Sequence, residues 1–161
     1  MLVLFVLSIL RAAQAVSFHN VSIPNNSSEI VYTPFLCDSE GGGDCKGGWQ
    51  ALDVNGTTVM STDGLDEDGP AIIPQMFLQI YAAALFITTS PQSNATINIT
   101  VSAGNRSIEQ QFPPPLSTIT VVDLIEDELT TFSITFINGT RLDVGTLIAQ
   151  VSDSSTRCPL L

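Results

Sequence analysis

The chain has 161 residues, 44% of them hydrophobic, with 16 Asp and Glu residues against 5 Lys and Arg residues. This length predicts a single domain with a sufficient core, and the hydrophobic content excludes a disordered chain. Binding to phosphates requires clustered positive charge, and the basic residues here are scattered. We therefore exclude nucleic acid as a partner.

The N-terminal segment is typical of a secretory signal peptide. Residues 2–10 form an apolar run that is too short to span a bilayer, and Ala13 and Ala15 provide small residues for cleavage. Arg11 follows the apolar run instead of preceding it, so the alternative is a buried N-terminal strand. We assign residues 1–15 to the signal peptide and 16–161 to one mature domain, and we expect a secreted or cell-surface protein.

Short stretches of β-forming residues alternate with turn residues along the mature chain. Asn55-Gly56 and Asn138-Gly139 are hairpin signals, and we expect the second to join the last two strands. Pro34 suits an edge strand because proline donates no backbone hydrogen bond. The spacing predicts an all-β fold, an antiparallel jelly roll or β-sandwich. The expected strands span residues 16–23, 29–35, 49–54, 57–61, 75–81, 85–89, 95–102, 107–112, 116–124, 131–137 and 141–152.

The longest uncharged run of the mature chain, residues 75–89, allows two interpretations. One helix would be apolar on every side and therefore fully buried. Two strands would span 75–81 and 85–89 and bend through the alanines at 82–84. The alanines favour helix, whereas the aromatic and β-branched residues around them favour strand. We expect two strands, because everything downstream also predicts short strands.

The cysteines and the asparagines both indicate an oxidising, secretory route. Cys37 and Cys45 flank a glycine-rich segment that can close a small loop, so we predict a disulfide between them. Cys158 is left over, and it is either free or forms an intermolecular disulfide. Eight Asn-X-Ser/Thr sequons predict a glycosylated surface, although a few arise by chance and Asn25 overlaps Asn26. The predicted glycosylation sites are Asn20, Asn26, Asn55, Asn94, Asn98, Asn105 and Asn138.

Several motifs follow one another in a characteristic order. Ile-Val-Tyr-Thr-Pro at 30–34 precedes Gly48-Trp49, a Gly-Pro-Ala segment at 69–71, an aromatic strand pair and a closing strand pair. In this order they resemble secreted or surface proteins of mushroom-forming fungi with a galactose-binding-like, discoidin-type jelly-roll domain, mostly uncharacterised. The resemblance implies a β-sandwich and, by analogy of fold, glycan or surface binding.

The chain departs from this family in two motifs and in its length. The bend of the aromatic pair lacks the usual glycine and has alanines at 82–84, and Leu129-Thr130-Thr131 replaces a usual histidine. Many relatives continue into a Ser/Thr-rich stalk and a transmembrane helix. We expect no membrane span in this chain, which is soluble or truncated.

The residues offer little for catalysis. The one histidine, His19, lies near the predicted cleavage site, where it is a solvated strand-edge residue and not the base of a hydrolase. Glu126, Asp127 and Glu128 are adjacent on a connector, whereas a glycosidase needs two carboxylates across a cleft. We therefore expect no enzymatic activity.

Two loops are the best candidates for binding. Asp63, Asp66 and Asp68 place hard oxygen ligands in a turn, as calcium requires, but the spacing is not that of an EF-hand. The alternative is a solvated acidic turn, so we expect no cofactor beyond a structural Ca²⁺ there. Trp49, next to two glycines, could offer a sugar an aromatic platform, although a lone tryptophan in a small sandwich is more often in the core.

These observations lead to one expected function and two alternatives. We expect a secreted, non-catalytic binding module for extracellular glycans, with Trp49 and the acidic loop at the site. One alternative is a structural glycosylated surface protein linked through Cys158, with no small-molecule ligand. A glycan-cleaving enzyme is the third possibility, and it requires two carboxylates facing each other in a cleft.

Overall fold

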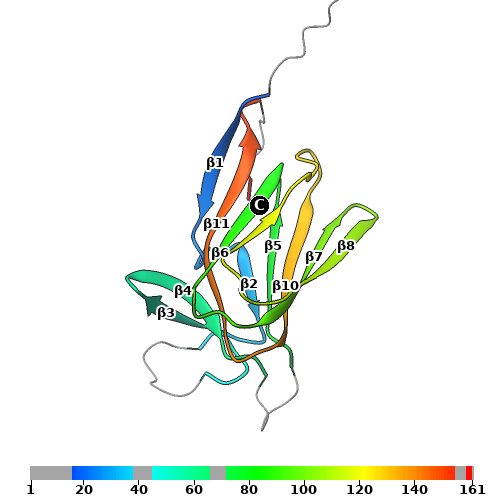
Figure 1. Cartoon of the computed structure of the whole chain (residues 1–161). Helices are drawn as coiled ribbons and strands as arrows, with labels where there is room; N and C mark the ends of the chain where they lie inside the picture. The colour runs from blue at the N-terminus through cyan, green and yellow to red at the C-terminus, as the bar shows by residue number, and fades with distance from the viewer. Residues whose placement is uncertain (1–15, 38–44, 66–71, 155–158, 161) are drawn as a thin grey trace, which may run out of the picture.

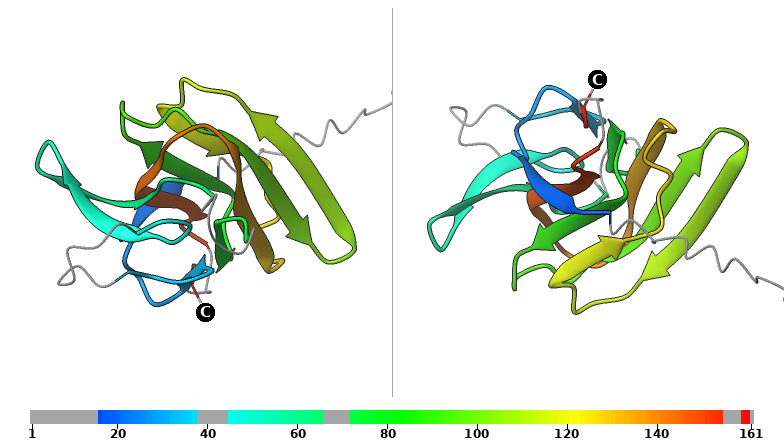
Figure 2. Two further views of the ribbon diagram at one scale, coloured as in Figure 1. Left: turned by 90° about the horizontal axis from the view of Figure 1, so that it is seen from below. Right: turned by 90° about the horizontal axis from the view of Figure 1, so that it is seen from above.

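Two antiparallel sheets pack face to face in the computed structural model, which describes residues 16–37, 45–65, 72–154 and 159–160 (Figures 1 and 2). The described residues contain strands and no helix, which confirms the predicted β-sandwich. The strands are β1 (Phe18–Ile23), β2 (Ile30–Thr33), β3 (Gln50–Val54), β4 (Thr57–Thr62), β5 (Gln75–Ile80), β6 (Ala84–Thr89), β7 (Thr96–Ala103), β8 (Arg106–Phe112), β9 (Thr118–Val121), β10 (Thr130–Asn138) and β11 (Leu142–Ser152).

Strand β11 lies at the centre of the first sheet, which we name sheet A. Its order is β3–β4–β11–β6–β9, with β1 also paired to β11, and the second sheet, sheet B, has the order β2–β5–β10–β7–β8. In β5, β7 and β10 alternate side chains point into the space between the sheets, as the strand period of two requires, whereas β8 at the edge of sheet B is almost entirely exposed. The largest buried side chains there include Trp49, Phe132, Met76, Leu85 and Ile134.

The uncharged run at residues 75–89 forms two strands, as expected, but they do not pair with each other. β5 lies in sheet B and β6 lies in sheet A, so the chain crosses the sandwich between them. The backbone of the crossing bonds to other segments: the Tyr81 N–H donates to the Pro159 carbonyl, and the Ala83 N–H donates to the Gln150 carbonyl. Ala82 is fully buried, which explains why a small residue stands at the bend.

The hairpin predicted for the last two strands is wrong. β10 belongs to sheet B and β11 to sheet A, and the Asn138-Gly139 segment joins the two sheets. The carbonyl of Arg141 accepts hydrogen bonds from the N–H groups of Asn94 and Ala95, so this segment is bound to another loop. Gly139 has φ 112° and lies against Ala95, where a Cβ would come within 2.7 Å of the backbone. The glycine is therefore required for close packing and not for a hairpin turn.

The local expectations for Asn55-Gly56 and for Pro34 are confirmed. Asn55 and Gly56 have φ values of 55° and 80°, as a tight turn between β3 and β4 requires. Pro34 follows β2, which is an edge strand of sheet B. No helix in the described ranges is long and apolar enough to cross a membrane.

The predicted disulfide between Cys37 and Cys45 is present, with a Cα–Cα distance of 5.9 Å. It lies next to the segment that carries Trp49, because the Cys37 N–H donates to the Trp49 carbonyl and the Trp49 N–H donates to the Phe35 carbonyl. The disulfide therefore helps to hold in place the segment that leads into β3.

Replacing both Cys37 and Cys45 by serine is expected to lower the free energy of unfolding by about 2–3 kcal/mol, because the open loop gains entropy in the unfolded chain. Urea unfolding with and without reductant measures this loss. Reduction of the natural chain should give the same loss and leave the double serine variant unchanged. Equal stability of the oxidised and reduced natural chain would contradict this role.

Candidate functional site

Trp49 does not lie on the surface, which corrects its predicted role as a sugar platform. Its side chain is 0% exposed, its Nε1 donates to the Thr33 carbonyl at 3.0 Å, and its ring contacts that of Tyr32 at a centroid distance of 5.0 Å. The same burial raises the pKa of Tyr32, since it disfavours the charged phenolate. A platform for a sugar must expose a ring face, so Trp49 is a core residue.

The acidic loop falls only partly within the described residues. Asp63 is exposed just after β4, whereas Asp66 and Asp68 lie outside the described ranges. Within those ranges, no three His, Cys, Asp or Glu side chains gather as a metal site would require. The predicted Ca²⁺ site at Asp63, Asp66 and Asp68 therefore stays a prediction, and so does the intermolecular disulfide of Cys158, which also lies outside these ranges.

Serine, histidine and aspartate do come together at the exposed end of β1, but in an order that differs from that of a catalytic triad. His19 Nδ1 lies 2.9 Å from Asp153 Oδ1, and the Ser17 hydroxyl donates to the other oxygen of Asp153. These bonds, led by that of Ser17, lower the pKa of Asp153. Aspartate stands between the other two residues, whereas a triad places histidine next to serine so that it can remove the proton.

The predicted glycosylation sites are spread over both sheets. Six of the seven asparagines are exposed and Asn98 is half-buried. Asn25, which overlaps Asn26, is buried, and its amide donates to the carbonyls of Thr58 and Val144 at 2.7 and 3.3 Å. Of this overlapping pair, only Asn26 presents its side chain to solvent.

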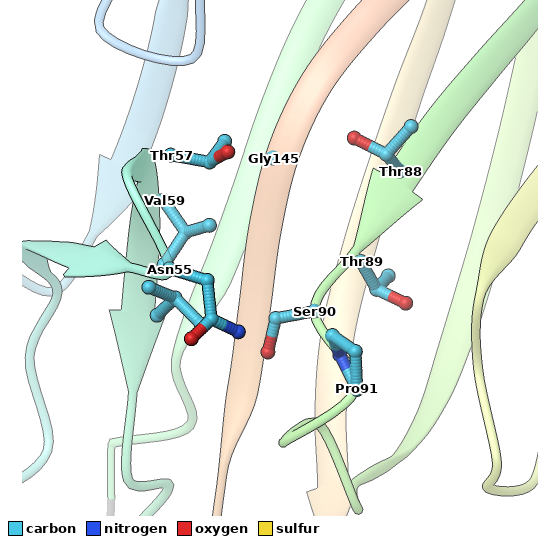
Figure 3. A pocket seen from close by; sticks show the side chains of 9 residues that line it. Asn55, Thr57, Val59, Thr88, Thr89, Ser90, Pro91 and Gly145 are labelled. Atoms are coloured by element: carbon cyan, nitrogen blue, oxygen red, sulfur yellow. The ribbon is translucent and has the colours of Figure 1, made fainter.

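One hollow among the described residues lies on the outer face of sheet A (Figure 3). Its volume is about 330 Å³, at the lower end of the range for small-molecule sites, about 300–1,000 Å³. Figure 3 shows β11 as its floor, the β3–β4 turn on one side and the end of β6 on the other. We name it the sheet A hollow, and the residues that matter below are Val54, Asn55, Thr57, Thr88, Ser90 and Pro91.

The hollow exists because β11 changes partner along its length. At one end β11 pairs with β4, up to Val144 opposite Met60, and further along it pairs with β1, from Leu147 opposite Ile23. The buried amide of Asn25 fills the fork, since it binds a carbonyl of β4 and a carbonyl of β11. Beyond the fork the β3–β4 hairpin diverges from the rest of sheet A, as Figure 1 shows.

The hollow is not filled from its floor, because the floor residue Gly145 has no side chain. The pairing of β11 with β6 shifts register between Val144 and Leu147, and Gly145 lies in this irregular stretch. A Cβ at this position would lie 2.6 Å from the Thr88 hydroxyl oxygen. A side chain at this position would therefore have to displace the Thr88 hydroxyl.

A buried ion pair fixes the wall formed by residues 90–94. The side chain of Asp143 is 0% exposed, and it accepts hydrogen bonds from the Ser90 hydroxyl and from Arg141 Nε, the latter at 2.8 Å. The Asp143 N–H donates to the Ser93 hydroxyl at 2.8 Å, and the Gln92 N–H donates to that of Ser90. The turn is thus held on β11 by side chains whose polar groups are mutually satisfied.

Only part of the polar lining is available to a ligand. Thr88 donates its hydroxyl to the Thr146 carbonyl, Thr89 donates to the Leu116 carbonyl, and Ser90 donates to Asp143. The side chains of Asn55 and Thr57 are exposed and form no hydrogen bond with another described residue. An amide and a hydroxyl therefore face the hollow with free donors and acceptors.

A second, less enclosed hollow of about 390 Å³ lies on the outer face of sheet B. It contains a half-buried aromatic ring, Phe77, next to the exposed Val31. Its polar groups are already paired, because Gln79 donates to Thr131 at 3.2 Å and Glu29 accepts from Ser27. The bond from Ser27 is the main reason why the pKa of Glu29 is lowered. This surface offers stacking but fewer free polar groups than the sheet A hollow.

Fold and strand order place the chain in the class of antiparallel β-sandwich proteins. The sequence matches no family model and no curated protein. Among solved structures, the chain is similar to a family two carbohydrate esterase from Cellvibrio japonicus, with a TM-score of 0.54 and 9% sequence identity. The match covers 90% of this chain and 36% of the esterase, so the chain spans only about a third of that protein, and the likeness shows the fold alone.

Proposed function

We propose that this chain is a secreted module that binds carbohydrate without cleaving it, in the sheet A hollow. One observation carries the proposal: the hollow presents an unpaired amide and an unpaired hydroxyl, from Asn55 and Thr57, beside the apolar surfaces of Val54 and Pro91. Sugars need such a combination, because hydroxyl groups require hydrogen bonds and the C–H faces of the ring require apolar contact.

Two further facts support this proposal. The solved structure to which the chain is similar is a carbohydrate esterase, a protein that acts on carbohydrate. The resemblance to galactose-binding-like domains of fungal surface proteins, which rests on short motifs, points to the same ligand class. A non-catalytic role is supported by the Asp143 carboxylate behind the wall of the hollow, because it is buried and bonded to Ser90 and Arg141.

Replacing Thr57 by valine is expected to weaken saccharide binding about 2- to 10-fold, because it removes one hydrogen bond worth about 0.5–1.5 kcal/mol and keeps the shape. The measurement is a glycan-array scan followed by titration, on protein produced without N-glycans in an oxidising compartment. We expect the same binding with calcium and with a chelator, since no carboxylate lines the hollow.

The matched control is Thr120→Val, because Thr120 is an exposed threonine of β9 in the same sheet, outside the hollow. It should leave binding unchanged. Loss of binding in Phe77→Ala but not in Thr57→Val would move the site to sheet B. Binding that disappears with the chelator would move it to the acidic loop.

A structural surface glycoprotein is the second candidate, because exposed sequon asparagines cover both sheets. Under that proposal the chain binds no saccharide on a broad array, and Cys158 links two copies. A dimer on a non-reducing gel that disappears in Cys158→Ser, together with a silent array, would replace the first proposal by this one.

A further inference from the structure

We propose that Asn55 carries an N-linked glycan whose first sugars lie in the sheet A hollow, so that glycosylation closes the binding site to external saccharides. The proposal rests on the function proposed above and adds its regulation. It makes the same two residues, Asn55 and Thr57, both the sequon and the free polar lining of the hollow.

The sequon at Asn55 is well presented for modification. Asn55 and Thr57 are exposed in the turn between β3 and β4, which is held by a bond of 2.9 Å from the Gly56 N–H to Asp53 Oδ1. Two other sequon asparagines, Asn94 and Asn98, are already engaged in the fold. Asn94 donates to Thr140 and accepts two backbone N–H groups, and Asn98 donates to Glu109.

The position of the amide directs the glycan. Asn55 and Thr57 both line the hollow, and in Figure 3 the amide end of Asn55 is turned across it toward Ser90. A sugar linked to Asn55 Nδ2 therefore starts at the rim. On the outer side of the turn the sugar would meet only solvent. On the inner side it would contact both walls of the hollow, the β3–β4 turn and the end of β6.

The chemistry of the hollow fits the first residue of an N-glycan. That sugar has an N-acetyl group and an apolar ring face, and the hollow provides the apolar surfaces of Val54 and Pro91 and the Thr57 hydroxyl. A tethered sugar also has a high effective concentration, in the millimolar range for a short linker. It therefore outcompetes an external saccharide that binds weakly at the same place.

Glycan occupancy at Asn55 then decides between two forms of the protein. The unmodified chain has an open hollow, and the modified chain has a hollow filled by its own sugar. Removal of the glycan would restore binding without any change of fold, because the turn is set by Gly56 and Asp53.

The test compares Thr57→Val in two hosts, because this change removes the sequon and keeps the Asn55 amide. Without N-glycosylation, Thr57→Val should weaken saccharide binding about 2- to 10-fold, through the lost hydrogen bond. In a secretory host that attaches N-glycans, the same change should strengthen binding relative to the glycosylated natural chain. The opposite signs distinguish this proposal from a loss of the site.

The control is Ser107→Ala, which removes the sequon at Asn105 in the β7–β8 turn of sheet B and should leave binding unchanged in both hosts. Mass spectrometry of the peptide must show an occupied Asn55. NMR contacts between the N-acetyl methyl group of the first sugar and Val54 or Pro91 provide a readout that does not depend on an external ligand.

Three outcomes would overturn the proposal: an unoccupied Asn55, an attached sugar without contact to the hollow, or equal saccharide binding by both natural forms. If the unglycosylated chain binds no saccharide, the proposed function fails. The NMR contacts then still decide whether the glycan lies in the hollow.

Discussion

Trp49→Ala is expected to lower the free energy of unfolding by about 3–5 kcal/mol and the melting temperature by about 10 °C. The indole is 0% exposed between the sheets and contacts Tyr32, and its removal leaves a cavity and an unpaired Thr33 carbonyl. Thermal and urea unfolding, monitored by circular dichroism, measure the loss.

Trp49→Phe serves as the matched variant, because it keeps an aromatic ring and loses the Nε1 bond, and it should cost less than half as much. Val31→Ala, on the exposed outer face of sheet B, should cost little. Trp49 is the only tryptophan, so its fluorescence reports directly on the core. A shift of that fluorescence upon saccharide binding, or a stable Trp49→Ala variant, would contradict the burial of the ring.

Asp143→Ala is expected to cost about 3 kcal/mol and to loosen the wall of the sheet A hollow. The change leaves Arg141 without its carboxylate and releases the Ser90 hydroxyl that holds the turn at 90–94. The cost is at the lower end for breaking a buried pair, about 3–5 kcal/mol, because the Arg141 side chain is 25% exposed and can reach water. Saccharide affinity should fall together with stability.

Asp153→Ala is the control for this experiment. Asp153 is also paired, with His19, but both side chains are about half exposed, so water screens the pair and its loss should leave stability almost unchanged. Arg141→Ala should cost at least as much as Asp143→Ala, since it leaves a fully buried carboxylate unpaired. Equal and small losses in all three variants would show that the ion pair does not hold the wall.

The sequence predicts the strands of this protein better than their partners. The expected strand at residues 95–102 corresponds to β7, Thr96–Ala103, and its apolar members Ile97 and Ile99 are buried. Asn55-Gly56 was sufficient to predict the turn between β3 and β4, and the short loop between Cys37 and Cys45 was sufficient to predict the disulfide. The pairing of β10 with β11 was wrongly predicted, because an Asn-Gly pair shows only that the chain turns, and the choice between hairpin and crossing depends on packing against Ala95.

The site was harder to predict, for two physical reasons. Trp49 beside glycines looks the same in sequence whether its loop faces water or the core, and here the Thr33 carbonyl and Tyr32 hold it inside. The sheet A hollow joins residues of four strands through the fork at Asn25, and no local pattern indicates such a divergence. Only the Asn55-Gly56-Thr57 sequon gave a signal at this place.

The position of β11 also has a consequence for the order of folding. This strand spans Leu142–Ser152, yet it pairs with β1, β4 and β6, which precede it by about 50 to 130 residues. Sheet A therefore lacks its central strand until residues 142–152 have left the ribosome, whereas β7 and β8 can pair as soon as they emerge. Such long-range pairing makes folding slow and leaves the edges of β4 and β6 exposed in the nascent chain, where they require protection from association.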